Sequence, residues 1–154
     1  MAEIIKNKWN KRFIELATVV GSWSSCYQEN RQVGAVIVKN KRILATGYNG
    51  APAGIRSCKD KCVCLRRELN IPSGTHQETC YAVHAEQNAI VQAARMGVCI
   101  DDATLYCTHQ PCSGCTKIII NAGIKKVIYK EGYPDEFSLR LFKEANIEVE
   151  KFAD

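Results

Sequence analysis

His84-Ala85-Glu86 and Pro111-Cys112-Ser113-Gly114-Cys115 are the two stretches on which the interpretation of this sequence depends. Each opens a segment with helical apolar spacing, over residues 84–96 and 112–122, and residues 103–107 between them have the pattern of a buried strand. Cysteines three residues apart on a first helical turn point to the same side of the helix. The two stretches therefore predict one metal site shared by two helix starts.

The chemistry of this predicted site follows from its ligand types. His84, Cys112 and Cys115 offer three ligands, and a catalytic zinc ion takes three from protein and leaves one position for water. Free N–H groups at a helix start favour the thiolate form of cysteine. Glu86 is too close to His84 to be a fourth ligand but can reach that water. We therefore predict hydrolytic chemistry in which Glu86 moves a proton from water to a ring nitrogen or a leaving ammonia.

Each part of the pattern also has a simpler interpretation. Two cysteines at this spacing are by themselves more typical of a structural zinc site or a redox pair, and a histidine at a helix start is usually an ordinary polar residue. Their combination with Glu86, in this order of strand and helices, favours the catalytic interpretation.

The rest of the chain predicts an α/β protein with parallel strands in its second half. A glycine-rich loop over residues 47–54 follows the second strand, and residues 55–82 form a polar, cysteine-rich insert with at most a short helix near Leu65–Leu69. No linker or repeat interrupts residues 1–154, which predicts a single domain. A first helix is predicted from the spacing of Ile5, Trp9, Phe13, Leu16 and Val20. The expected elements are helices over 4–22, 84–96, 112–122 and 136–145, and strands over 33–38, 42–46, 103–107, 126–129 and 147–151.

Composition limits the possible classes. The 154 residues are 46% hydrophobic, with no apolar run long enough to cross a membrane. The charged start of the chain is unlike a signal peptide, so we expect a cytoplasmic protein. Nine cysteines in that compartment favour metal binding over disulfides. The net charge of +5 would suit an anionic partner, but the basic residues are spread along the chain, which disfavours a nucleic-acid interface.

With these motifs, the chain resembles the cytidine and deoxycytidylate deaminase superfamily, and within it the deoxycytidylate (dCMP) deaminases. The resemblance covers residues 26–150, and its more particular features are the Gly47-Tyr48-Asn49-Gly50 loop and the cysteine-bearing insert. It implies a three-layer α-β-α fold around a mixed five-stranded sheet. It also implies a nucleotide substrate, dCMP, that is hydrolysed to dUMP and ammonia.

The resemblance further implies roles for individual residues. Asn49 would contact the sugar or base, the backbone N–H of Ala85 would bind the pyrimidine carbonyl, and Tyr133 would lie near the phosphate. The simpler interpretations are a turn residue for Asn49 and a surface aromatic for Tyr133. The family also implies a homo-oligomer, often a hexamer, and regulation by dCTP and dTTP, with Mg²⁺ accompanying an effector nucleotide.

A second, structural zinc site is implied by the cysteines outside the two motifs. Some dCMP deaminases hold such an ion with a cysteine after the first helix and others from the insert. The expected ligands are Cys26, Cys58, Cys64 and Cys80, with Cys62 as a substitute for Cys64. A closed four-sulfur site would order the long insert, whereas buried free cysteines are the simpler alternative.

Two other functions compete with dCMP deamination. A guanine, tRNA-adenosine or free-cytidine deaminase would use the same chemistry, although free-cytidine enzymes typically have a cysteine at the position of His84. A competence-type, zinc-stabilised nucleic-acid-binding module would keep the scaffold without catalysis. Glu86 counts against that module, because a protein that only binds needs no proton-transferring group beside a zinc ion.

Overall fold

A mixed five-stranded sheet in the order β2-β1-β3-β4-β5 forms the middle of the protein. The computed structural model describes residues 1–153, apart from the side chains of residues 2–6. β1 pairs antiparallel with β2 and β3, whereas β3, β4 and β5 run parallel, which confirms the predicted parallel second half. The strands are β1 (Gly34–Lys39), β2 (Arg42–Tyr48), β3 (Thr104–His109), β4 (Lys126–Glu131) and β5 (Glu148–Lys151).

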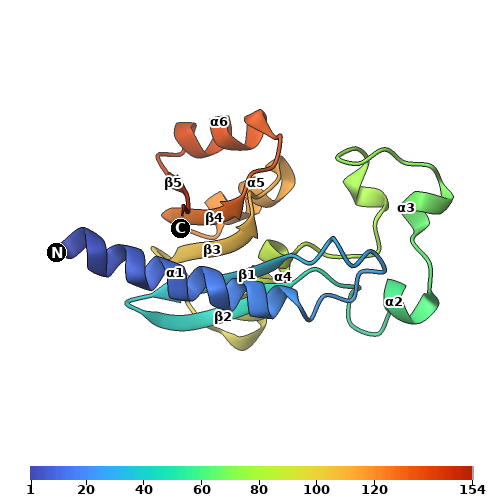
Figure 1. Cartoon of the computed structure of the whole chain (residues 1–154), viewed down its shortest axis with the longest axis horizontal. Helices are drawn as coiled ribbons and strands as arrows, with labels where there is room; N and C mark the ends of the chain where they lie inside the picture. Colours follow the sequence, from blue (N-terminus) through green and yellow to red (C-terminus); the bar gives the residue numbers. More distant parts are fainter. Residues whose placement is uncertain (154) are drawn as a thin grey trace.

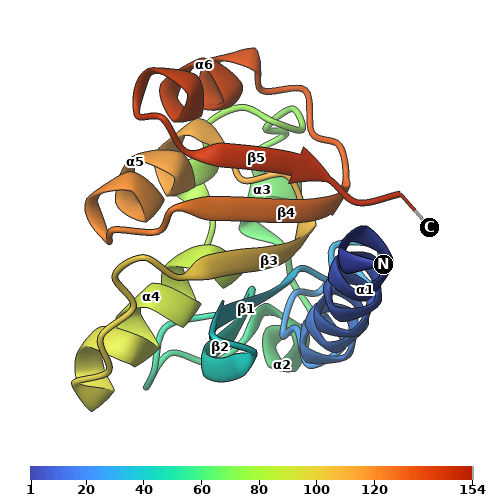
Figure 2. The same cartoon turned by 90° about the vertical axis from the view of Figure 1, so that its left-hand side faces the viewer.

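Helices cover both faces of this sheet, which confirms the predicted three layers (Figure 2). One face packs against α1 (Ala2–Gly21), whose apolar side includes Phe13, Ala17 and Val20. The predicted contribution of the Ile5 side chain lies outside the described residues. The other face packs against α4 (Ala85–Met96), α5 (Ser113–Asn121) and α6 (Glu136–Glu144). No helix within residues 1–153 is long and apolar enough to span a membrane.

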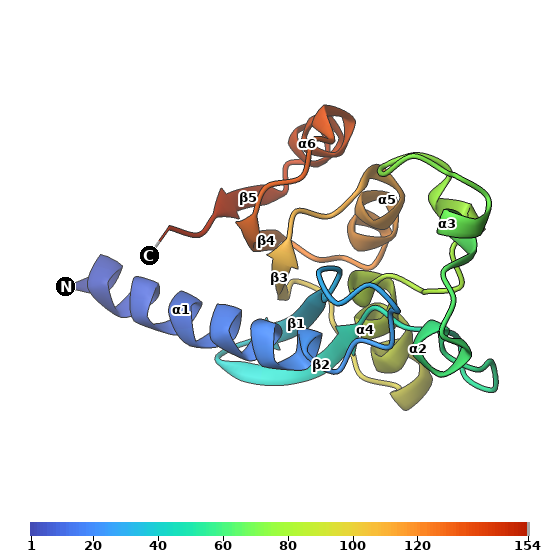
Figure 3. The same cartoon turned by 45° about the vertical axis from the view of Figure 1, so that its right-hand side comes forward.

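Residues 55–82, here called the insert lobe, lie beyond one end of the sheet (Figures 1 and 3). They contain α2 (Cys58–Lys61), α3 (Leu65–Glu68) and a 3-10 turn over Gln77–Thr79. The sequence predicts only the helix near Leu65; the Cys58–Lys61 helix has the same length of four residues but a polar sequence without apolar spacing. α2 begins where the Ser57 hydroxyl accepts the Asp60 N–H at 3.0 Å, a local capping interaction.

Two close backbone contacts fix the start of α4 against β2. A side chain at Gly47 would collide with the main chain at Ala85 and Ala89, so glycine allows the helix to lie directly on the strand. Gly50 and Val83 exchange two backbone hydrogen bonds of 2.8 and 3.2 Å. The glycine-rich loop is therefore attached to the residue that immediately precedes His84.

Candidate active site

His84, Cys112 and Cys115 come together at the starts of two neighbouring helices. His84 caps α4, Cys112 caps α5, and Cys115 lies in the first turn of α5. The Nδ1 atom of His84 is 3.5 Å from the sulfur of Cys112 and 3.3 Å from that of Cys115. Within the described part of the chain, no other three His, Cys, Asp or Glu ligand atoms lie within 4.8 Å of one another. The three residues singled out from the sequence are therefore adjacent in space.

The separations in this group fit a zinc ion. Zinc binds sulfur at about 2.3 Å and imidazole nitrogen at about 2.0 Å, so in a tetrahedron the nitrogen and a sulfur are about 3.5 Å apart. The observed 3.3 and 3.5 Å agree with that spacing. Two sulfurs and one imidazole also leave one tetrahedral position without a protein ligand, as catalytic sites require.

The two thiols of this group shift each other's pKa in opposite directions. A hydrogen bond from the Cys115 thiol lowers the pKa of Cys112 to about 4. The same hydrogen bond, with burial, raises the pKa of the Cys115 thiol. The hydrogen bond to Cys112 also raises the pKa of His84. Cys112 is therefore the more acidic thiol of the pair, and a bound cation would favour the thiolate form of both, as expected of thiolate metal ligands.

Glu86 lies in the first turn of α4 beside the three ligand residues, with only 4% of its surface exposed. Its Oε2 atom is 3.7 Å from the Cys115 sulfur. Burial raises the pKa of this carboxyl group, and the nearby His84 partly opposes the effect. A carboxyl group with a raised pKa can both accept and return a proton near neutral pH, which suits general acid and base catalysis.

His84, Glu86 and Cys112 line a cavity of about 380 Å³ that reaches from the helix starts to the insert lobe. Such a volume suits a small molecule. Asn49, Ala85 and Tyr133, the residues expected to contact substrate, all line it. Ala85 is the first residue of α4, so its N–H is not used by the hydrogen-bond ladder of the helix.

The side chain of Asn49 also has a structural function that the sequence does not reveal. Its Oδ1 accepts the Val33 N–H at 2.9 Å, and its Nδ2 donates to the Arg31 carbonyl at 2.6 Å. Asn49 therefore fixes the backbone before β1 as well as facing the cavity. Its role toward a substrate remains a prediction.

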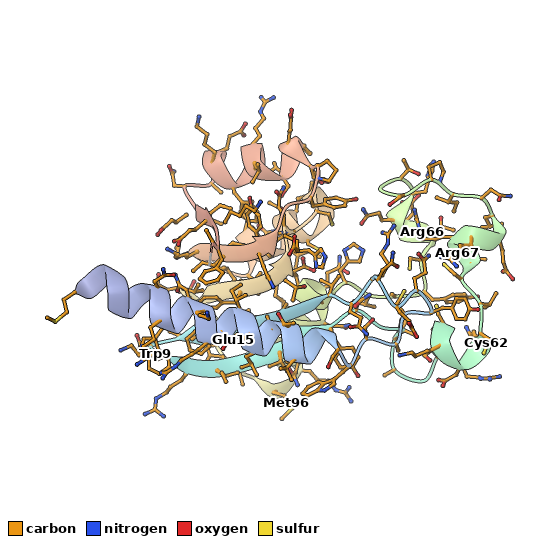
Figure 4. All side chains as sticks on the ribbon, in the orientation of Figure 1. Trp9, Glu15, Cys62, Arg66, Arg67 and Met96 are labelled. Atoms are coloured by element: carbon orange, nitrogen blue, oxygen red, sulfur yellow. The ribbon has the colours of Figure 1, made fainter. Side chains whose placement is uncertain are left out.

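The insert lobe forms one wall of the cavity through contacts that sequence analysis missed. The Arg31 guanidinium donates to the Ser73 hydroxyl at 2.8 Å, and the Gln77 amide donates to the Tyr133 hydroxyl at 2.8 Å. Arg66, on α3, donates to the carbonyls of residues 72, 75 and 76 and so holds this wall together (Figure 4). The pairs Arg31–Ser73 and Gln77–Tyr133 are far apart in sequence, and nothing in the sequence indicates that their members are partners.

The four cysteines of the expected second metal site lie close enough to influence one another's pKa, but they do not form a closed cluster. Burial raises the pKa of Cys26 and of Cys58, and charges on Cys64 and Cys80 raise both further. Burial also acts on Cys64, but hydrogen bonds from Gln28 and from the backbone of α3 outweigh it and lower its pKa. These four sulfurs do not all lie within 4.8 Å of one another.

Cys62, the expected substitute for Cys64, lies apart from the other four cysteines. It is exposed at the outer side of the insert lobe (Figure 4), and its sulfur is 3.5 Å from the Lys59 carbonyl. It ends α2 with a φ of 54°, a left-handed conformation that turns the chain between Cys62 and Cys64. The geometry therefore favours Cys64 as the ligand.

Residues 7–131 match the sequence model of the cytidine and deoxycytidylate deaminase zinc-binding region. The deoxycytidylate deaminase of Saccharomyces cerevisiae is 39% identical over 99% of this chain and 47% of its own length. The deoxycytidylate deaminase of Mycobacterium phage D29 is 40% identical over 79% of this chain and 93% of its own length. The chain thus spans about half the length of the yeast relative.

A solved structure has the same arrangement of helices and strands. The dCMP deaminase of cyanophage S-TIM5, crystallised in complex with dCMP and dUMP, superposes with a TM-score of 0.72 at 33% identity. The superposition covers 92% of this chain and 94% of the phage protein. The predicted sheet and layer arrangement is therefore that of known deaminases.

Proposed function

This chain belongs to the cytidine and deoxycytidylate deaminase family, and from that membership we propose that it hydrolyses dCMP to dUMP and ammonia. The observation that carries the proposal is the buried Glu86 beside His84, Cys112 and Cys115 at one end of a nucleotide-sized cavity. We propose residues 1–154 as one deaminase domain, with the insert lobe as part of its binding site.

In the proposed mechanism, His84, Cys112 and Cys115 hold a zinc ion and Glu86 moves the protons. When bound, zinc supplies the Lewis acidity that lets a water molecule lose a proton near neutral pH. Glu86 accepts that proton and donates it to ring N3 of the cytosine. The water oxygen bonds to C4, and Glu86 then takes the remaining proton from that oxygen and passes it to the amino group. The C4–N bond breaks as the C4 carbonyl forms, and ammonia leaves.

The residues that line the cavity would position the substrate. We propose that the Ala85 N–H binds the pyrimidine carbonyl and that Asn49 orients the sugar or base. The position of the insert lobe favours a mononucleotide substrate over a nucleic-acid strand. Its residues Ser73 and Gln77 form a wall of the cavity and are hydrogen-bonded to Arg31 and Tyr133. Arg31 and Tyr133 then lie where a phosphate could be bound by charge and by a hydroxyl group.

The substrate class is tested by measuring ammonia release from dCMP, CMP, deoxycytidine, guanine and a tRNA anticodon stem-loop. We expect the 5′-monophosphates dCMP and CMP to give a higher kcat/KM than deoxycytidine or guanine, because only a 5′-monophosphate can bind the Arg31 side of the cavity through its phosphate. Ammonia release from another substrate, with none from dCMP, would contradict the proposal. Zinc binding without turnover of any substrate would favour a binding module.

Replacing Arg31 by Gln is expected to raise the KM for dCMP about tenfold while leaving the KM for deoxycytidine unchanged. A charged hydrogen bond contributes about 1.5–3 kcal/mol, and 1.4 kcal/mol corresponds to a factor of ten in affinity. Steady-state kinetics with both substrates measure the difference. Arg95→Gln removes the same charge from an exposed residue of α4 outside the cavity and is the matched control. An equal change for both substrates would place the phosphate elsewhere.

The remaining parts of the proposal concern assembly and regulation. We propose a second, structural zinc ion held by Cys26, Cys58, Cys64 and Cys80, and a cytoplasmic location. We also propose a homo-oligomer, with the hexamer as the expected form. Large apolar side chains are exposed on α1 and the turn after it, on β2 and on α4, as at subunit contacts, among them Val19, Trp23, Ile43, Val91 and Met96. Regulation by dCTP and dTTP, with Mg²⁺ on the effector, belongs to the same proposal.

A further inference from the structure

A network of side chains that do not line the cavity holds the backbone around Cys112. It connects the loop between β3 and α5 to the start of α6. The Asp135 carboxylate accepts the Ser113 N–H at 2.7 Å with Oδ2 and the Ser138 N–H at 2.9 Å with Oδ1. The Ser138 hydroxyl donates to the Pro111 carbonyl at 2.7 Å. One short segment thus binds both neighbours of Cys112.

The orientation of the Ser138 hydroxyl group is fixed by its neighbours. Ser138 and Thr116 are both 0% exposed, and their hydroxyl oxygens are 2.8 Å apart. Because Ser138 donates its hydrogen to Pro111, the hydrogen between the two hydroxyls must come from Thr116. The network is therefore fully satisfied and directional, and removing one member leaves another buried polar group without a partner.

These contacts hold the two peptide groups on either side of Cys112. Ser138 binds the carbonyl of the peptide group that precedes Cys112, and Asp135 binds the N–H of the one that follows. Cys112 itself has an extended backbone, with φ −71° and ψ 166°, and lies before the first turn of α5. The helix alone therefore does not fix its conformation. With both flanking peptide groups held, the direction of its Cα–Cβ bond is fixed.

We propose that Asp135, Ser138 and Thr116 are positioning residues that hold the Cys112 sulfur at the correct distance from His84 for zinc. None of the three lines the cavity, so they act through Cys112 and not on substrate. The inference rests on the zinc site of the proposed function. Groups that orient metal ligands in this way typically change metal affinity by about 10–100-fold when they are removed.

The test compares zinc affinity, and the absorption spectrum of the cobalt-loaded protein, between wild type and Ser138→Ala. We expect zinc affinity to fall about 10–100-fold and the sulfur-to-cobalt charge-transfer band to shift. Glu144→Gln, at an exposed position on the same helix, is the control and should change neither. Unchanged affinity and an unchanged spectrum in Ser138→Ala would overturn the inference.

A double variant, Thr116→Val with Ser138→Ala, separates positioning from folding. Removing both hydroxyls should recover part of the lost stability, because Thr116 no longer has an unpaired buried group. Zinc affinity should stay low, since the Pro111 carbonyl still has no donor. Recovery of affinity together with stability would show a merely structural role.

Asp135→Asn keeps the shape of the side chain and decides the question if the alanine variant does not fold. Its amide oxygen can replace one carboxylate oxygen but not both, so zinc affinity should again fall. Wild-type affinity in this variant would overturn the inference. A wild-type protein that binds neither zinc nor cobalt would instead contradict the proposed function.

Discussion

Glu86→Gln is expected to lower kcat for dCMP by about 10²–10⁴-fold while the protein keeps its zinc. Glutamine has the size of glutamate but cannot accept and return a proton, so the transfers to N3 and to the amino group lose their carrier. Because Glu86 is not a ligand, His84, Cys112 and Cys115 should hold the metal as before. The measurements are ammonia release and zinc content on the same protein sample.

Without metal, the same variant is expected to be at least as stable as the metal-free wild type at neutral pH. Burial raises the pKa of Glu86, which means that the folded protein disfavours its charged form. A carboxyl group with a raised folded pKa stabilises the protein below its unfolded pKa, and this contribution is lost as the pH rises through the folded value. A neutral amide has no such cost. Equilibrium unfolding at pH 5 and pH 8 measures the difference.

Glu15→Gln provides the control, because Glu15 is exposed on α1 (Figure 4) and does not line the cavity. This variant should retain full activity and full zinc content. If Glu86→Gln turned over dCMP at the wild-type rate, the proposed mechanism would be wrong. If it lost both zinc and activity, Glu86 would instead support the ligands.

Helices and strands could be predicted from the sequence because their signals are local. Apolar periodicity predicts the helices and strands of the three-layer fold. The motifs also place His84 and Cys112 at helix starts, where the structure has them as the capping residues of α4 and α5. Given the order of strands and helices, the N-termini of α4 and α5 are then expected to lie next to each other.

Contacts between distant segments could not be predicted in this way. The pairs Arg31–Ser73 and Gln77–Tyr133 depend on how the insert lobe folds back, and no periodicity describes such a segment. Asp135 and Ser138 have the sequence pattern of an ordinary helix start. Their contacts with Ser113 and Pro111 exist only because α5 and α6 lie side by side. Charge and residue type identify candidate groups, but their partners depend on the tertiary fold.

The different surroundings of Cys62 and Cys64 also could not be predicted from the sequence, because they depend on the tertiary fold. Two cysteines separated by one residue are equivalent in the sequence, and the left-handed conformation of Cys62 distinguishes them. That turn leaves Cys62 exposed and buries Cys64 near Cys26 and Cys58. A backbone conformation of this kind is rare outside glycine and has no sequence signal here.

Cys64→Ser is therefore expected to lower the zinc content from two ions per chain to one, whereas Cys62→Ser should leave two. Three thiols cannot close a tetrahedral four-sulfur site, so the structural ion should be lost. An ion present at one hundred times its Kd stabilises the folded state by about 2.7 kcal/mol. For a chain of this size, that loss lowers Tm by about 5–11 °C. Metal analysis and thermal unfolding of the matched pair measure both effects.

The same pair of variants also tests how the structural ion affects the active site. The insert lobe carries Ser73 and Gln77, which form a cavity wall, and it carries none of His84, Glu86 or Cys112. Loss of the structural ion should therefore raise the KM for dCMP more than it lowers kcat. One zinc ion per chain in the wild type would contradict the four-cysteine site. Loss of zinc in Cys62→Ser but not in Cys64→Ser would assign the ligand to the exposed cysteine and require the lobe to refold around the metal.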